Sequence, residues 1–120
     1  MSKMQKKSFS RPGETRTFEK GELQLLDLGG VTFGRATFQP GWKWSTSVKP
    51  LVHTKSCEAA HLTYHASGRL RVIMDDGSEE EFGPGDVSLI PPGHDAWVIG
   101  DETVVLIDVS GMANYATPSP

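Results

Sequence analysis

The sequence predicts an all-β fold, an antiparallel sandwich or barrel built from short strands. Thirteen glycines and eight prolines break up nearly every apolar run of the 120-residue chain, which is typical of strands and turns. The remaining runs predict roughly nine strands at spacings of about 8–12 residues. No stretch has the apolar periodicity of an amphipathic helix. The length and the uniform composition indicate one domain with one core.

Each predicted strand ends at glycine, proline or acidic turn residues. The turn Asp75–Ser78 predicts a hairpin, whereas Thr46–Ser56 lacks alternation and is predicted to be a loop. Residues 14–110 should form the barrel, with flexible segments at residues 1–13 and 111–120. The predicted strands are Glu14–Phe18, Glu22–Leu28, Val31–Phe38, Ala60–Ala66, Arg69–Met74, Glu79–Phe82, Val87–Ile90, Ala96–Ile99 and Thr103–Val109.

Strand alternation assigns several side chains to faces. In Ala60–Ala66, His61 and His65 should share one face, because successive side chains of a strand point to opposite sides. By the same argument Trp42 and Trp44 should share the face of an extended strand. These four side chains are therefore candidates for the barrel interior.

The segment 85–99, GDVSLIPPGHDAWVI, combines a Gly-Asp turn, two prolines, a glycine and a His-Asp pair. Pro91 and Pro92 remove two ladder donors and force an extended backbone, so the strand should kink there. The kink should direct the next residues, His94 first, toward the barrel opening.

Charge and cysteine content exclude several protein classes. A formal net charge of −3 gives no case for nucleic-acid binding, which usually needs a basic face. Cys57 is the single cysteine, so no intrachain disulfide forms, which suits a reducing cytosol. No apolar run approaches the ~20 residues of a membrane span, and the N-terminus has no apolar signal region. We therefore expect a cytoplasmic protein without a membrane partner.

Three local patterns resemble those of the cupin superfamily. HLTYHASGRLRV is similar to the family's first motif, and DDGSEEEFGPGDVSLIPPG to its second. A β-branched run follows, so the resemblance covers about half of the chain, from Ala60 to Val109. PGWKW and PPGHDAWVIGDE also resemble small single-domain cupins, many of them of unassigned function. The resemblance implies a double-stranded β-helix, a barrel related to the jelly roll.

The usual metal ligands of the family are not at their places in this chain. The resemblance implies a His-x-His pair, a glutamate seven residues before the first motif's glycine, and a histidine three residues after the Pro-x-Gly glycine. Counted from Gly68, the glutamate place holds His61, and counted from Gly93, the last histidine place holds Ala96. The histidine pair falls on Lys55 and Cys57, or on Thr54 and Ser56.

A different ligand set is therefore the metal hypothesis. His61, His94 and Cys57, with His53 as a fourth candidate, supply nitrogen and sulfur donors, which favour zinc, copper or ferrous iron over magnesium or calcium. The alternative is that these histidines only form hydrogen bonds inside a pocket. Cys57 is either a reactive thiol near basic residues or a buried, inert side chain. Candidate carboxylates to orient a histidine are Asp95 and Glu58, although alternation turns Asp95 away from His94.

Three function classes follow, since this fold supports unrelated activities. The first is a small-molecule-binding cupin, the second a metal-dependent enzyme of dioxygenase or isomerase type, and the third a non-catalytic dimeric module. Edge pairing through Glu14–Phe18 predicts a homodimer. The predicted pocket residues are His61, His65, His94, Trp97 and Trp44.

Overall fold

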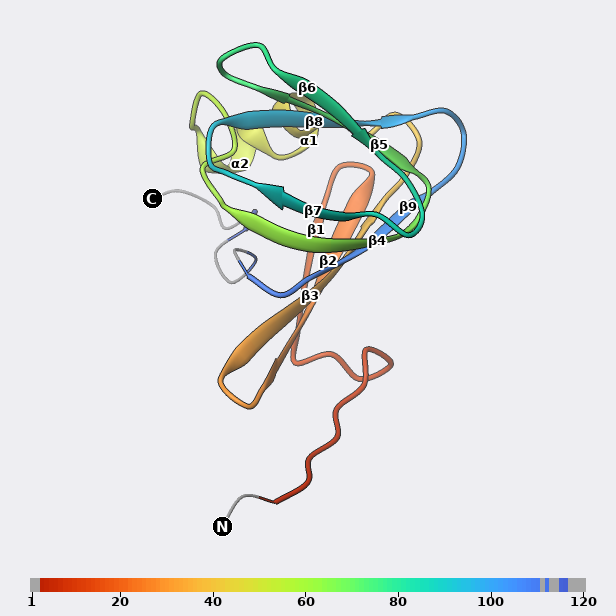
Figure 1. Cartoon of the computed structure of the whole chain (residues 1–120). Helices are drawn as coiled ribbons and strands as arrows, with labels where there is room; N and C mark the ends of the chain where they lie inside the picture. The colour runs from red at the N-terminus through yellow and green to blue at the C-terminus, as the bar shows by residue number, and fades with distance from the viewer. Residues whose placement is uncertain (1–2, 111, 113–114, 117–120) are drawn as a thin grey trace.

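The computed structural model describes residues 3–110, 112 and 115–116 and contains two antiparallel sheets facing each other (Figure 1). The larger sheet has the order β1-β2-β3-β9-β4-β7 and the smaller one β6-β5-β8. No continuous ladder joins the two sheets within these residues. The strands are β1 (Glu14–Phe18), β2 (Gly21–Leu28), β3 (Val31–Phe38), β4 (His61–Ser67), β5 (Arg69–Met74), β6 (Glu79–Phe82), β7 (Val87–Ile90), β8 (His94–Ile99) and β9 (Val104–Asp108).

The core lies between the sheets and takes apolar side chains from both. Leu23 and Ala36 of the larger sheet are fully buried, and Leu70 and Val72 of the smaller sheet pack in the same cluster. Alternation explains this division, because β4 and β8 bury every second residue. The predicted all-β fold is confirmed, and the predicted strand bounds agree within two residues.

The alternation predicted for the first histidine strand is confirmed. His61, Thr63 and His65 of β4 are buried, whereas Leu62 and Tyr64 are exposed. On the smaller sheet Arg69 and Arg71 point outward and pair with Glu81 and Glu79 of β6. The strand periodicity thus separates inward from outward side chains at the positions that matter for the site.

Two short helices, α1 (Trp44–Ser47) and α2 (Lys49–Val52), occupy part of the segment predicted as a loop, and α1 begins two residues before it. The second helix ends at His53, whose φ of 60° is left-handed. The prediction that Trp42 and Trp44 share a strand face is wrong, because Trp42 precedes α1 and Trp44 begins it. Both rings are nevertheless 2% exposed. Four-residue helices are too short for an apolar periodicity to reveal.

Part of the segment expected to be a flexible tail contributes to the core. Met112, Tyr115 and Ala116 are buried, and the Arg16 guanidinium of β1 donates a 2.8 Å hydrogen bond to the Tyr115 carbonyl. The other residues from 111 to 120 lie outside the described part of the chain. In the part that is described, none of the helices has the length and apolar character needed to cross a bilayer.

Candidate metal centre

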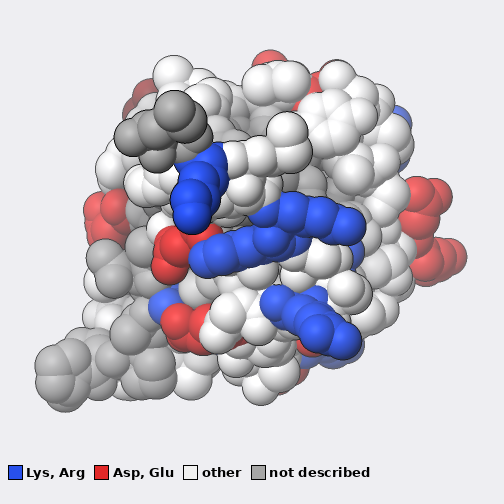
Figure 2. Space-filling view, turned by 90° about the horizontal axis from the view of Figure 1, so that it is seen from below, with Lys and Arg blue, Asp and Glu red and all other residues white. Residues whose placement is uncertain are grey.

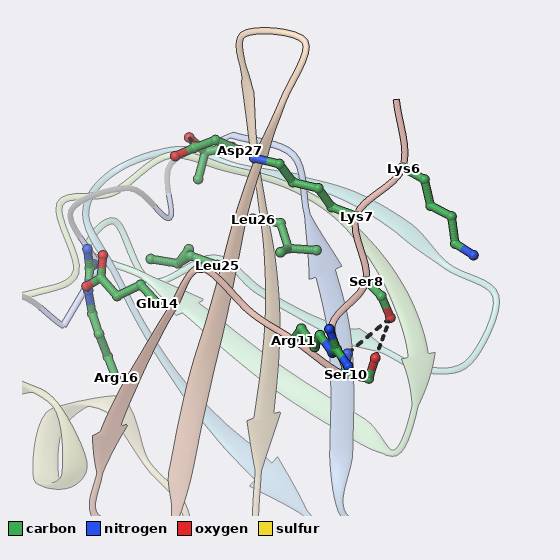
Figure 3. A pocket seen from close by; sticks show the side chains of 12 residues that line it. Lys6, Lys7, Ser8, Ser10, Arg11, Glu14, Arg16, Leu25, Leu26 and Asp27 are labelled. Atoms are coloured by element: carbon green, nitrogen blue, oxygen red, sulfur yellow. Dashed lines mark hydrogen bonds and ion pairs between the residues drawn. The ribbon is translucent and has the colours of Figure 1, made fainter. Parts of the chain in front are cut away.

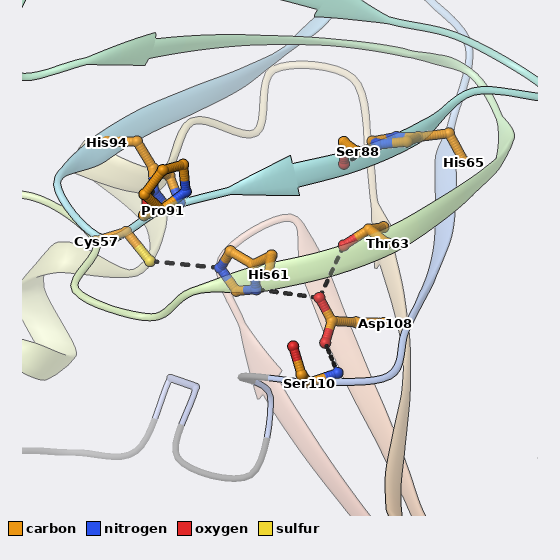
Figure 4. A network of polar contacts seen from close by, with 9 residues as sticks. All are labelled: Cys57, His61, Thr63, His65, Ser88, Pro91, His94, Asp108 and Ser110. Carbon is orange, nitrogen blue, oxygen red and sulfur yellow. Dashed lines mark hydrogen bonds and ion pairs between the residues drawn. The ribbon is translucent and has the colours of Figure 1, made fainter.

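Cys57, His61 and His94 converge at one end of the space between the sheets (Figure 4). Each offers a ligand atom, and these atoms all lie within 4.8 Å of one another. The three side chains are 3%, 6% and 4% exposed. Cys57 Sγ lies 3.7 Å from His61 Nε2, and the two imidazole centroids are 5.3 Å apart.

The backbone brings these residues together from distant parts of the sequence. His61 begins β4 and His94 begins β8, so each is the first inward-facing residue of its strand. Cys57 forms an isolated bridge with His94, in which Cys57 N donates to the His94 carbonyl at 2.7 Å. Gly93, with a φ of 93°, makes the turn that starts β8 and donates to the Cys57 carbonyl. The Pro-Pro-Gly turn therefore fixes the spacing of the thiol and one imidazole.

A buried carboxylate orients His61. Asp108 at the end of β9 is 0% exposed, and its Oδ2 accepts from His61 Nδ1 at 3.2 Å and from Thr63 Oγ1 at 2.8 Å. Its Oδ1 accepts from the Ser110 backbone N–H at 2.7 Å. Since a carboxylate only accepts, the His61 proton is on Nδ1 and the Nε2 lone pair faces Cys57.

A backbone carbonyl orients the His94 ring in the same way as the carboxylate orients His61. Its Nδ1 lies 2.8 Å from the Pro91 carbonyl, which can only accept a hydrogen bond. The proton is therefore on Nδ1, and Nε2 is the nitrogen left for a ligand. Both imidazoles have the tautomer and the oriented N–H that metal-binding histidines show.

Burial shifts the pKa values of Cys57 and His94. It raises the pKa of the Cys57 thiol to about 11, with smaller effects from nearby charges. It lowers the pKa of His94, against the opposing effect of the Pro91 hydrogen bond. At neutral pH the imidazole of His94 is thus neutral, and the thiol keeps its proton until a metal displaces it.

A cavity of about 40 Å³ adjoins the three ligand residues. Besides the group itself, Thr63 and His65 are its polar lining residues, and Trp42, Trp44 and Tyr115 each add an aromatic ring with one polar N–H or O–H group. His65 Nε2 is hydrogen bonded to Ser88 Oγ at 2.8 Å, and its ring stacks on Phe82. The apolar lining is Phe38, Trp42, Trp44, Leu70, Val72, Ile90, Ala96, Leu106, Met112 and Tyr115.

No model of a known protein family and no curated protein matches the chain. Solved structures do match. A cupin-like protein from Thermotoga maritima is 18% identical, with a TM-score of 0.57 over 90% of this chain and 83% of that one. A protein of unknown function from Rhizobium leguminosarum is 21% identical, with a TM-score of 0.60 over 98% of this chain and 100% of that one.

The chain has the cupin fold. An oxalate decarboxylase from Bacillus subtilis with Mn(II) centres is also similar, at 21% identity and a TM-score of 0.54. The match covers 78% of this chain but only 26% of that one, so the chain spans about a quarter of that enzyme's length. At these identities the likeness concerns the fold.

Within this cupin fold, several predicted site residues come together. His61, His94 and Cys57 converge, and His65 and Trp44 line the cavity. His94 and Ala96 both point inward from β8, so the histidine lies one inward position before the place where cupins usually keep a ligand.

Two predicted site residues lie elsewhere. Trp97 does not line the cavity, because it stands three residues from His94 and therefore on the other face of β8; Lys43 Nζ lies 5.3 Å from its ring centroid. His53 is exposed at the end of α2 and is not part of the ligand group found among the described residues. Trp97 and His53 are thus the two predicted site residues that the structure does not bring to this group.

The orienting carboxylate is also not one of those predicted. Glu58 accepts from Ser56 Oγ and Asp95 from the Ser45 backbone N–H, whereas Asp108 holds His61. The sequence could have indicated Asp108, because strand alternation places it on the same inward face as Val104 and Leu106.

The donor set fits a tetrahedral transition metal. Ordinary zinc bond lengths separate a thiolate sulfur from an imidazole nitrogen by about 3.6 Å, and the sulfur and His61 Nε2 are 3.7 Å apart. The widest pair of ligand atoms, at up to 4.8 Å, has to close by about 1 Å to reach the same geometry.

A larger groove of about 770 Å³ lies between the N-terminal segment and the β2–β3 hairpin (Figure 3). Lys6, Lys7 and Arg11 line it together with Glu14 and Asp27. Basic side chains also gather on the face seen from below (Figure 2). The groove contains none of the predicted ligand residues, and its charged lining residues are mostly exposed. It is therefore a poorer candidate for a metal or catalytic site than the cavity beside Cys57, His61 and His94.

Proposed function

We propose that the chain binds a divalent transition metal through Cys57, His61 and His94, and that this centre acts on a small molecule held in the adjoining cavity. The convergence of three buried donors carries the proposal. Buried polar side chains that serve only packing do not need an imidazole Nε2 turned toward a thiol, as that of His61 is. A purely structural module would favour a filled core, and the histidine-lined cavity argues against it.

The donors favour a softer metal than manganese. Manganese prefers carboxylate and water ligands, whereas a thiolate with two imidazoles suits zinc, copper or ferrous iron. A divalent ion with an open coordination position polarises a carbonyl group or lowers the pKa of a bound water. The protein would supply three ligands, hold the imidazoles in one tautomer through Asp108 and Pro91, and exclude bulk water with the apolar cavity wall.

Removal of single ligands tests this proposal. The wild-type protein should bind one metal ion per chain by elemental analysis after reconstitution with zinc, iron or copper. Cys57→Ser and His94→Gln should each weaken binding by at least about 100-fold, more than the loss expected from an orienting residue. His53→Gln, which removes an exposed histidine outside the group, is the matched control and should bind as wild type does.

A folded wild-type protein that takes up no stoichiometric metal under these conditions would contradict the proposal. The same is true if Cys57→Ser and His53→Gln bind equally well. Circular dichroism on each variant separates loss of the site from loss of the fold.

We also propose that the chain forms a homodimer through β1. This strand is one edge of the six-stranded sheet, and an edge strand is a common place for a second copy to pair. Light scattering at micromolar concentration should give twice the monomer mass, and a monomeric mass would contradict the proposal. Leu89→Lys, on the exposed face of β7, should leave the dimer intact; dissociation would place the interface there instead.

A further inference from the structure

Trp42 carries a buried donor without an acceptor. Its Nε1 is the one buried side-chain nitrogen or oxygen in the described residues that lacks a hydrogen-bond partner. The side chain is 2% exposed and lines the cavity beside the metal group. Native structures rarely leave such a group unsatisfied, since burying an unpaired polar group costs free energy.

The surroundings hold the indole in place. Its ring stacks on Phe38 with centroids 3.8 Å apart and planes tilted by 17°. The Trp42 carbonyl accepts from Val98 N at 3.0 Å, and its backbone N–H donates to the Gln39 carbonyl at 3.0 Å. Because the ring is stacked and the backbone is bonded on both sides, the indole cannot readily turn to find another acceptor. Because Trp42 is one of the residues that line the cavity, we infer that the acceptor is a molecule held there.

The buried charges indicate what kind of molecule this is. A divalent ion contributes two positive charges, which the Cys57 thiolate and the fully buried Asp108 carboxylate balance. A charged ligand would leave a net charge within apolar walls, which is costly. The balance therefore favours an uncharged ligand, and the cavity of about 40 Å³ has room for about three water-sized groups.

We propose that Trp42 is the residue that selects the ligand, and that its indole N–H donates to the oxygen of a small uncharged carbonyl compound. This inference rests on the proposed function, because the metal group forms one side of the cavity. The carbonyl oxygen accepts this hydrogen bond while the proton stays on the indole nitrogen, and the remainder of the molecule, a few heavy atoms, lies against the apolar wall.

Formamide and formate are matched probes, since both have three heavy atoms and they differ in charge. In protein labelled with ¹⁵N on tryptophan, Trp42→Phe identifies the Trp42 indole signal among those of the three tryptophans. Formamide should shift that signal downfield and saturably, and should leave the signal of Trp97, outside the cavity, unchanged. Formate should have a much smaller effect. Trp42→Phe, which keeps a ring but removes the donor, should weaken formamide binding about tenfold.

The experiment separates the two proposals. Trp42→Phe should bind metal with wild-type stoichiometry. If this variant binds metal but has lost formamide binding, the loss is due to the missing indole donor and not to the metal site. A Trp42 signal that stays unchanged with formamide in both zinc-loaded and metal-free protein would overturn the donor role. A response to formate equal to that to formamide would overturn the assignment of an uncharged ligand. Failure of metal uptake in wild-type protein would instead contradict the proposed function.

Discussion

Asp108→Ala is expected to lower the free energy of unfolding by about 2–6 kcal/mol, because it leaves two buried donors without an acceptor at about 1–3 kcal/mol each. The carboxylate is 0% exposed and accepts from the side chains of His61 and Thr63 and from the Ser110 backbone. Alanine leaves the buried donors of His61 and Thr63 without an acceptor, whereas the N–H of the exposed Ser110 can turn to water. Urea denaturation of the metal-free protein measures the loss.

Asp108→Asn distinguishes the role in stability from the role at the metal. Asparagine retains one acceptor oxygen and nearly the same volume, so the loss of stability should be smaller. Metal affinity should still fall about 10–100-fold, because a neutral amide no longer fixes the His61 proton on Nδ1. Asp76→Asn, at an exposed turn, should change neither quantity. A loss below about 1 kcal/mol for Asp108→Ala would show that the network does not stabilise the fold.

Alternation predicted the faces of the strands from local sequence, and that prediction was sufficient to place most of the site. His61 and His65 lie inward, as expected, and His94 lies on the inward row of β8. Trp97 was assigned to the pocket against the same rule, since an odd separation from His94 puts it on the opposite face. Its aromatic character suggested a pocket role, but the geometry of the strand decided otherwise.

Contacts between segments that are distant in the sequence explain the features that local sequence patterns did not predict. Asp108 faces Thr63 because β9 pairs with β4 in that register, and nothing within β9 reveals this partner. Met112 and Tyr115 lie in a stretch without strand or helix periodicity, yet they pack in the core. His53 is near Cys57 in sequence, but the left-handed turn that ends α2 leaves it exposed. Each of these outcomes depends on tertiary packing.

Gly68→Ala should cost about 2–5 kcal/mol, as the sum of about 1–2 kcal/mol for a left-handed backbone and about 1–3 kcal/mol for overpacking. Gly68 has a φ of 72° and lies where the chain passes from β4 to β5. A Cβ there would stand 2.6 Å from the Thr103 carbonyl oxygen and 2.8 Å from Val104 Cα. Because these are backbone atoms, no side-chain rotation relieves the contact, and the start of β9 has to move.

Gly77→Ala is the matched control for this substitution. Gly77 has a φ of 90°, but a Cβ there meets nothing within 4 Å, so only the backbone cost of about 1–2 kcal/mol applies. Thermal and urea unfolding of both variants measures the difference, and equal losses would contradict the crowding argument. The effect should extend to the metal centre, because β9 runs from Val104 to Asp108. A shift at its start moves the carboxylate relative to His61, so Gly68→Ala should weaken metal binding and Gly77→Ala should not.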